Sequence, residues 1–417
     1  MKAVLEAISG YKRNGIVAFA VCPSRRTTVG LCLAGAWGLS VATHWYVIVP
    51  ASVVGQVAAD LATTEATAIW LVSAVPGTWA LSNIVLGGWI DRFGPVRMIE
   101  LGTVAVIACV LASWWTATEG AFLPLLGTRL VAGVAVGLIW TASADLIGGL
   151  VGATHRGTAL GFLVTSAPTG FAIGQVLTPP IAATGGWPAN FLLTAIAAFA
   201  ALLLLRVGLR RVSVAAVSST SSALANLAAV RSRPVAFGSV LAYAAYSIYL
   251  FLNSWLPTYL TQEFAAGAAL AGLVAAAFPA VGIVSRTGGG ILSDRLLGRR
   301  RVPVLQAAFL VSVPLIVGLA LVRSLTFLVL GLIAAGFVVQ LTFGVVYSYV
   351  RESVGTAVTG TALSVVTTSG MAGAFSAPIV TGMLIDSGGG FGTAFGYAIV
   401  LAVIGVAVAV LAPESPG

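Results

Sequence analysis

The sequence predicts an all-α membrane protein with twelve transmembrane helices, arranged as two six-helix repeats that share one orientation. Three observations predict this fold class: the composition, a series of apolar blocks and an internal repeat. Hydrophobic residues make up 59% of the 417 residues and charged residues only 8%, whereas about a quarter of the residues of a soluble protein are charged. The composition therefore excludes an ordinary soluble protein and places the chain in a lipid bilayer.

Apolar blocks recur along the whole chain, and each is long enough to cross about 30 Å of hydrocarbon as a helix of roughly 20 residues. The chain holds twelve such blocks. In chain order, the expected spans are 28–54, 66–90, 98–118, 121–147, 157–183, 187–207, 235–260, 266–291, 302–322, 325–349, 357–384 and 393–412.

Basic residues are concentrated before the first span and in the loops that follow the even-numbered spans. The other loops carry acidic residues, with Arg323 as the one basic exception. By the positive-inside rule, we expect the basic loops and both termini to lie in the cytoplasm and the helices to cross the cytoplasmic membrane. The net charge of +9 then reflects the orientation of the chain in the membrane and does not indicate that the protein binds nucleic acid. Residues 1–26 lack the apolar core and cleavage site of a signal peptide, so we expect the first span to direct insertion.

The chain matches itself at a constant offset of 203 residues, which predicts that a six-helix unit was duplicated. The matched positions are Pro76 and Pro279, Gly87 and Gly290, Asp91-Arg92 and Asp294-Arg295, residues 157–160 and 360–363, and Gly170 and Gly373. Because each unit holds an even number of helices, both copies are expected to face the same way. The expected parts are a first half (1–207), a linker (208–234) and a second half (235–417). The linker is rich in Ser, Ala and Arg, which is typical of a cytoplasmic linker or of a helix on the membrane surface.

Two similar segments, GGWIDRFGPVR (87–97) and GGILSDRLLGRR (289–300), each join two spans by a tight basic turn. Together with the six-plus-six layout, they resemble the signature loop of the major facilitator superfamily of transporters, and the resemblance covers essentially the whole chain. It implies a cytoplasmic charge network that holds one state of the alternating-access cycle. Anchoring of the topology by the arginines alone is the alternative. The gating residues implied are Asp91, Arg92, Arg97, Asp294 and Arg295, and Asp145, near the cytoplasmic end of span 121–147, is expected to join them.

Arg286 stands in apolar sequence eight residues before Asp294, about 12 Å of helix rise, which places it inside the membrane. The stretch SRTGGGILSDR (285–295) resembles the eighth helix of oxalate and formate carriers and of nitrate and nitrite transporters, where an arginine binds the anion; monocarboxylate carriers have an arginine on the same helix. A guanidinium stays charged, and its fork of donors matches carboxylate or nitrate oxygens. The resemblance implies that Arg286 is the anion site. The alternative is that it extends toward the cytoplasm or belongs to the gating network.

The number of positively charged side chains in the middle of the membrane bears on the charge of the substrate. The position equivalent to Arg286 in the first half is Asn83, since 286 minus 203 is 83, whereas the nitrate transporters carry a second arginine there. Residues 363–378 also lack the lysine of the oxalate carriers. One central cation, or two with Arg129, favours a monovalent anion over a dianion. The segment WLPTYL (255–260) resembles that of organic-anion symporters and favours a carboxylate over nitrate.

Other polar residues within the spans are further candidates for the site. TRLVAGVAVG (128–137) resembles the second motif of the family, and a charge at the depth of Arg129 costs at least ~2.5 kcal/mol unless it is paired. Arg129 is expected either to contact the substrate or coupling ion, or to bond backbone carbonyls or a polar group of span 28–54. His44 is expected to be a proton acceptor or an anion donor, with a neutral, hydrogen-bonded histidine as the alternative. Residues that could line a central cavity, or serve only as helix contacts, are Asn83, Gln175, Tyr243, Tyr246, Asn253 and Gln340.

The sequence contains no nucleotide-binding loop, metal-ligand cluster or catalytic Ser/His/Asp spacing. We therefore expect that the protein is not an enzyme and needs no cofactor or metal. We expect a transporter driven by ion gradients. The resemblance implies a monomeric carrier of a small monovalent organic anion, a monocarboxylate, with proton symport. SAPTGFAIGQ (166–175) resembles a motif of the exporters, with Ala167 in place of a glycine, so efflux of drug-like compounds is one alternative. Nitrate or nitrite transport is another, and a membrane receptor or scaffold without transport activity is a third.

Overall fold

The computed structural model describes residues 23–151, 153–210, 232–296, 300–355 and 358–414, and within them every regular element is a helix. Most of the expected linker therefore lies outside the described residues. The elements are α2 (Pro23–Ser52), α3 (Val54–Asp60), α4 (Glu65–Ala68), α5 (Trp70–Phe93), α6 (Pro95–Thr118), α7 (Phe122–Leu150), α8 (Ala153–Val164), α9 (Ser166–Gly185), α10 (Ala189–Leu209), α12 (Arg233–Glu263), α13 (Ala268–Ala280), α14 (Gly282–Leu296), α15 (Val302–Leu321), α16 (Leu325–Ser353), α17 (Thr359–Leu384), η1 (Ile385–Gly389) and α18 (Gly390–Leu411).

The predicted all-helical membrane fold is confirmed, and the structure fits twelve spans, three of which are interrupted helices. Ten helical stretches of the described residues are long and apolar enough to cross a membrane, and a bent helix with a 66° angle between Asn83 and Val85 gives an eleventh. The longest stretch, Thr359–Leu411, has 53 residues, about 80 Å of helix, which is too long for a single crossing. Gly388 and Gly390, with φ of 91° and 59°, interrupt it, and α17 and α18 pack against each other as two spans. The fifth span breaks between α8 and α9, and the eighth between α13 and α14.

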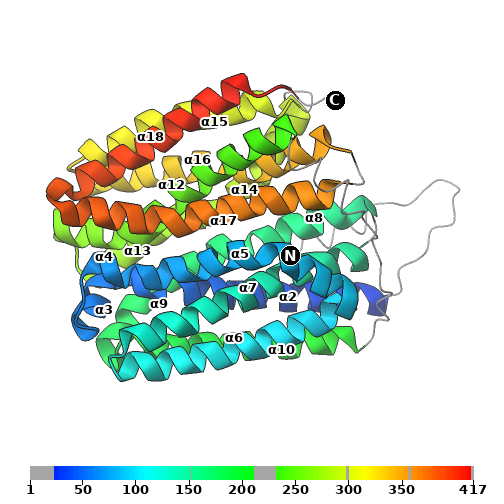
Figure 1. Cartoon of the computed structure of the whole chain (residues 1–417), viewed down its shortest axis with the longest axis horizontal. Helices are drawn as coiled ribbons and strands as arrows, with labels where there is room; N and C mark the ends of the chain where they lie inside the picture. Colours follow the sequence, from blue (N-terminus) through cyan, green and yellow to red (C-terminus); the bar gives the residue numbers. More distant parts are fainter. Residues whose placement is uncertain (1–22, 152, 211–231, 297–299, 356–357, 415–417) are drawn as a thin grey trace, which may run out of the picture.

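The helices form two groups that follow the order of the chain. In Figure 1, α2 to α10 fill the lower part of the bundle and α12 to α18 the upper part. The two groups meet where α5 packs on α17, α9 on α13 and α2 on α12. We call the end of the bundle that carries Arg92, Arg97 and Arg301, on the right of Figure 1, the basic end, and the opposite end, which carries Asp60 and Glu65 on α3 and α4, the acidic end.

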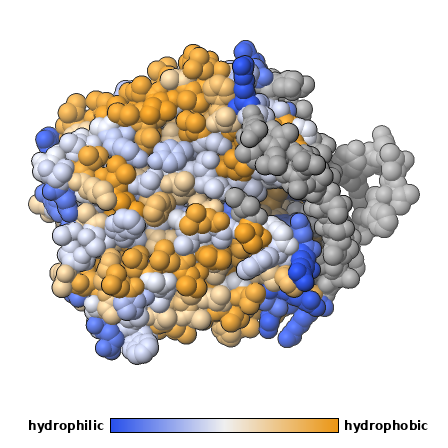
Figure 2. Space-filling view, viewed as in Figure 1, coloured by the Kyte–Doolittle hydropathy of each residue, from blue (hydrophilic) through white to orange (hydrophobic). Residues whose placement is uncertain are grey.

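The sides of the bundle are apolar. Large apolar side chains in the middle of helices are widely exposed there, for example Ile196 at 64% and Leu310 at 60%. Figure 2 shows hydrophobic residues along the face of the molecule and the most hydrophilic residues at its two ends. A soluble monomer rarely exposes so much contiguous apolar surface, so this pattern fits a surface in contact with lipid.

The internal repeat is visible in the way that helices approach each other. A Cβ atom on Gly133 of α7 would overlap the Val75 carbonyl oxygen of α5. A Cβ atom on Gly336 of α16 would lie 2.7 Å from the Phe278 carbonyl oxygen of α13. Both pairs are separated by the offset of 203 residues (336 minus 133, and 278 minus 75). Small residues thus let the same two helices of each half approach closely, as is common in membrane bundles.

We predict that Gly133→Leu lowers the free energy of unfolding by about 1–3 kcal/mol, because its side chain has to displace backbone atoms of α5. Thermal unfolding of the purified protein in detergent measures the effect. Gly127→Leu, on the exposed face of the same helix with nothing within 4 Å of its Cβ, is the matched control and should unfold as the wild type does. Equal unfolding temperatures for the two variants would contradict the close contact.

Candidate functional site

Arg286 of α14 lies in the interior of the bundle, and its side chain is only partly satisfied. The residue is 7% exposed. Its side chain makes one hydrogen bond within the described residues, in which Nε donates to Gln340 Oε1 of α16 over 3.2 Å. No described carboxylate forms an ion pair with it. The hydrogen bond described for this side chain thus uses Nε and neither of the two terminal nitrogens of the guanidinium.

Aromatic rings of the second half lie against this guanidinium, and a ring of the first half packs on one of them. Its Cζ lies 5.0 Å from the centre of the Tyr249 ring and 4.5 Å from that of Phe343. Tyr246 packs against Phe343 with ring centres 4.4 Å apart. Tyr249 of the second half also meets Phe171 of the first, edge to face at 5.6 Å. A cation over aromatic faces is attracted to them, and the rings keep lipid and bulk water away from the charge.

His44 of α2 continues the cluster into the first half. Its ring lies 6.4 Å from Trp79, 6.1 Å from Trp140 and 5.7 Å from Phe171, measured between ring centres. Nδ1 lies 2.7 Å from the Ser40 carbonyl oxygen, so we assign the ring proton to Nδ1, which leaves Nε2 as an acceptor. Phe171 packs in turn against Tyr249, whose ring centre lies 5.0 Å from the Arg286 Cζ, so aromatic rings connect the histidine to the guanidinium. The cluster thus joins the one buried histidine of the described residues to Arg286.

Several buried donors near these residues have no partner in the described structure. They include the Tyr249 hydroxyl, the Trp79 indole N–H and the Ser285 hydroxyl. A buried polar group without a partner costs about 1–3 kcal/mol, and such groups are rare in folded proteins. Unused donors beside an unpaired guanidinium are the arrangement expected of a site that receives an anion.

Arg129 of α7, in contrast, finds all its partners inside the protein. It is fully buried, and its guanidinium donates to the carbonyl oxygens of Leu71, Tyr46 and Val47 while lying 4.3 Å from the centre of the Tyr46 ring. Pro50 stands four residues after Tyr46 and has no N–H, so the Tyr46 carbonyl lacks its helical donor. This geometry corresponds to the structural alternative for Arg129, in which it bonds backbone carbonyls.

Two amide side chains link the halves of the protein. Gln175 Nε2 of α9 donates to the Asn253 carbonyl of α12 over 3.0 Å, and that carbonyl lacks its helical donor because residue 257 is a proline. Toward the basic end, Asn83 Nδ2 of α5 donates to the Ser364 carbonyl of α17 over 3.1 Å and to Thr368 Oγ1 over 3.3 Å. These residues therefore connect helices and do not touch Arg286.

The other predicted site residues are distributed as follows. Tyr243 pairs with Ser376 of α17 through their hydroxyls at 2.8 Å, within the second half. The side chains of Asp294 and Arg295 lie outside the described residues. Asp91, Arg92, Arg97 and Asp145 are exposed near the basic end, and Asp145 is within electrostatic range of Asp91 and Arg156.

The described ion pairs of the basic end lie within single halves. Arg206 pairs with Glu100 at 2.9 Å in the first half, and Arg301 pairs with Glu352 at 2.7 Å in the second. Sequence reasoning did not single out these pairs. It also missed the rings around Arg286 and His44, although Trp140 and Phe343 stand at the repeat offset of 203, which could have indicated them.

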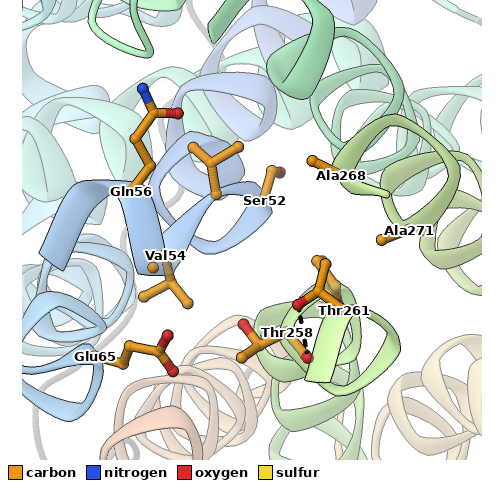
Figure 3. A pocket seen from close by; sticks show the side chains of 11 residues that line it. Ser52, Val54, Gln56, Glu65, Thr258, Thr261, Ala268 and Ala271 are labelled. Carbon is orange, nitrogen blue, oxygen red and sulfur yellow. Dashed lines mark hydrogen bonds between the residues drawn. The ribbon is translucent and has the colours of Figure 1, made fainter. Parts of the chain in front are cut away.

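A separate cavity of about 200 Å³ opens between the halves at the acidic end (Figure 3). Residues 52–56 and Glu65 line it from the first half, and α12 and α13 line it from the second. Figure 3 shows the Glu65 carboxylate and the Thr258 side chain on facing sides. Glu65 accepts a hydrogen bond from Gln262 Nε2 of α12 at 3.3 Å. This cavity shares no lining residue with the cluster around Arg286 and His44.

Known proteins resemble this chain in sequence and in fold. A family model described as Major Facilitator Superfamily matches residues 35–377 and 235–417. The chain is 27% identical over 350 residues to the probable nitrate/nitrite transporter NarK2 of Mycobacterium tuberculosis, across 82% of this chain and 85% of the relative. It is 25% identical over 328 residues to the cis,cis-muconate transport protein of Acinetobacter baylyi, across 75% and 76%. The crystal structure of a bacterial homologue of the human lysosomal transporter Spinster, inward-facing and occupied, superposes with a TM-score of 0.73 at 16% identity, across 94% and 97%.

We predict that Arg129→Met destabilises the protein by about 1–3 kcal/mol, because the Tyr46 carbonyl loses the donor that replaces the missing N–H of Pro50. Thermal unfolding of four proteins forms a double-mutant cycle: wild type, Arg129→Met, Pro50→Ala and the double variant. In the Pro50→Ala background the residue at 50 can donate to Tyr46, so the cost of Arg129→Met should be smaller there. Strictly additive effects would show that Arg129 does not act through this carbonyl.

Proposed function

Because the chain belongs to the major facilitator superfamily, we propose that it transports a small monovalent oxyanion, a monocarboxylate, across the cytoplasmic membrane by alternating access. Arg286 is the anion site in this proposal, and the protein acts as a monomer in the bilayer with both termini in the cytoplasm. The two parts that rock against each other are residues 1–207 and 235–417. A carrier of this kind binds its substrate near the middle of the membrane, between the two repeats.

The observation that carries the proposal is the state of the Arg286 guanidinium. It is buried against rings of the second half, and the hydrogen bond described for its side chain uses Nε and neither of the two terminal nitrogens. A fixed charge inside a membrane protein is expensive and usually marks the path of an ion or substrate. An oxyanion bound to the two terminal nitrogens would satisfy the donors and offset the charge.

The charge of the site favours one negative charge on the substrate. Arg129 is satisfied by backbone carbonyls, and Asn83 rather than a second arginine occupies the position equivalent to Arg286. Nitrate or nitrite is the second candidate, supported by the similarity to a probable nitrate/nitrite transporter over 82% of this chain. A carboxylate and nitrate present the same planar pair of oxygens to a guanidinium, so both fit the free donors.

The two amide links supply contacts that alternating access would have to break in turn. The link from Gln175 to Asn253 joins the halves on the side toward the acidic end, and the link from Asn83 to Ser364 joins them toward the basic end. Opening toward one end separates one pair while the other pair holds. In this scheme these residues, and Tyr246 beside Phe343, act in closure and not as ligands of the anion.

The ring contacts that connect His44 to Arg286 give a route to proton symport. Phe171 and Tyr249 connect the imidazole to the guanidinium, and a proton and a cation placed in one dry cluster repel each other. A bound anion offsets the charge of Arg286, so protonation of His44 becomes more favourable at the moment of binding. Anion and proton would then be carried together.

We predict that at least one anion among formate, acetate, lactate, pyruvate, oxalate and nitrate stabilises the purified carrier against heat, and that Arg286→Gln abolishes the effect. A ligand at 100 times its dissociation constant should add about 2.7 kcal/mol. Arg206→Gln, which removes an exposed arginine paired with Glu100, is the matched control and should respond as the wild type does. If lipophilic cations stabilise the protein and none of these anions does, the site belongs to an exporter of drug-like compounds.

We predict that anion uptake into proteoliposomes becomes faster as the external pH falls, and that His44→Gln removes this dependence while downhill exchange of the anion continues. The direction follows from the coupling of anion binding and protonation at His44. Uptake is measured with and without an imposed pH gradient. A His44→Gln variant that still accumulates the anion in response to a pH gradient would place the proton elsewhere.

A further inference from the structure

We propose that Gln340 and Gly282 form a positioning device for Arg286, which fixes the guanidinium so that its outer edge, the two terminal nitrogens, is offered to a planar oxyanion. This inference rests on the proposed anion site and assigns Gln340 a role next to that site and not in it. It also narrows the ligand to one oxyanion group bound edge-on.

The orientation of the Gln340 amide is determined by its own hydrogen bonds. Its Nε2 donates to the Phe278 carbonyl over 2.8 Å and to the Gly336 carbonyl over 3.2 Å. Both partners are acceptors, so the amide nitrogen has to point toward them and the amide oxygen away from them. That oxygen accepts the hydrogen bond from Arg286 Nε. The fully buried Gln340 thus connects the backbone of α13 to the side chain of α14.

Gly282, at the start of α14, makes room for this amide. A Cβ atom at position 282 would overlap Gln340 Oε1 and lie 2.8 Å from its Nε2. The overlap is with the end of a flexible side chain and not with backbone, so an alanine there can be accommodated if Gln340 moves away. The hydrogen bonds of Gln340 to Phe278 and Arg286 would then be lost. A glycine at 282 is therefore required for the positioning and not for the fold.

The first half has a similar contact between the equivalent helices, but the large and the small residue have exchanged places. The positions equivalent to Gly282 and Gln340 are Trp79 and Gly137 (282 minus 203, and 340 minus 203). A Cβ atom on Gly137 would lie 2.5 Å from Trp79 Cδ1. In the first half the large side chain thus comes from α5 and reaches His44, and in the second half it comes from α16 and reaches Arg286. Each of these two large side chains, Trp79 and Gln340, thus contacts one titratable or charged residue, His44 or Arg286.

The choice of a neutral amide preserves the charge of the site. A carboxylate at 340 would cancel the charge of Arg286, whereas an amide oxygen satisfies Nε and leaves the full positive charge on the guanidinium. The rings of Tyr249 and Phe343 lie over the guanidinium at 5.0 Å and 4.5 Å. With Nε occupied, the hydrogen-bond donors that remain are those of the two terminal nitrogens, which lie in the plane of the guanidinium. Two coplanar oxygens of a carboxylate or nitrate match that edge.

The test compares Gly282→Ala and Gln340→Met with the wild type in the full-length purified carrier. The first variant displaces the amide, and the second keeps the volume and removes the hydrogen bonds. Gly318→Ala is the matched control, because its Cβ meets nothing within 4 Å. Nitrate and pyruvate are titrated separately, with thermal stabilisation as the readout. The rate of modification by phenylglyoxal, measured by peptide mass spectrometry, follows Arg286, with the fully buried Arg129 as an internal control for the fold.

We expect both variants to bind nitrate and pyruvate at least tenfold more weakly and to react severalfold faster at Arg286, with Arg129 unchanged and the Gly318→Ala control behaving as the wild type does. Unchanged affinity and unchanged reactivity in both variants would overturn the positioning role. If neither anion stabilises the wild type, the proposed anion site fails for these two probes. The rate of modification at Arg286 still decides in that case whether Gln340 holds the guanidinium.

Discussion

A guanidinium inside a bilayer has to be enclosed and given partners, and the rest of this structure follows from how two such groups are treated. Arg129 donates to three backbone carbonyls of neighbouring helices and retains no free function. Arg286 receives one partner, Gln340, together with aromatic faces that attract its charge without neutralising it. The first arrangement stabilises helix packing. The second keeps a charge available near the boundary between the two halves, where a transporter of this family needs it.

Backbone carbonyl groups next to prolines also need partners inside the membrane. A proline inside a span leaves the carbonyl four residues earlier without its helical donor, and no water is available there to replace it. Arg129 supplies that donor for Tyr46, and Gln175 supplies it for Asn253. The first bond lies within one half and can be permanent. The second joins the two halves, because the Asn253 carbonyl of the second half takes its hydrogen-bond donor from Gln175 of the first. This bond contributes to holding the halves together.

The sequence was sufficient to predict the twelve spans, their six-plus-six repeat and the family, because composition and spacing carry those features directly. It also placed Arg286 and His44 inside the membrane and indicated them as candidates for binding an anion and a proton. It left Arg129 open between two roles, since the role depends on a carbonyl freed by Pro50 on another helix. The rings of Trp79, Phe171, Tyr249 and Phe343 were missed, because aromatic residues in a span also serve as interfacial anchors and only the packing brings these four together. The fit of Gln340 into the space beside Gly282 needs both helices to be seen at once.

The opposite filling of the two equivalent gaps has a consequence for the history of the chain. After a duplication the two halves began with the same residues at both positions, so at least two substitutions have occurred at these positions since then. The helices of the two halves are then no longer interchangeable. A recombinant that pairs Trp79 with Gln340 would place two large side chains in one gap, and one that pairs Gly137 with Gly282 would leave a hole. Divergence between the repeats has in this way become a barrier to exchange between them, which keeps the halves distinct.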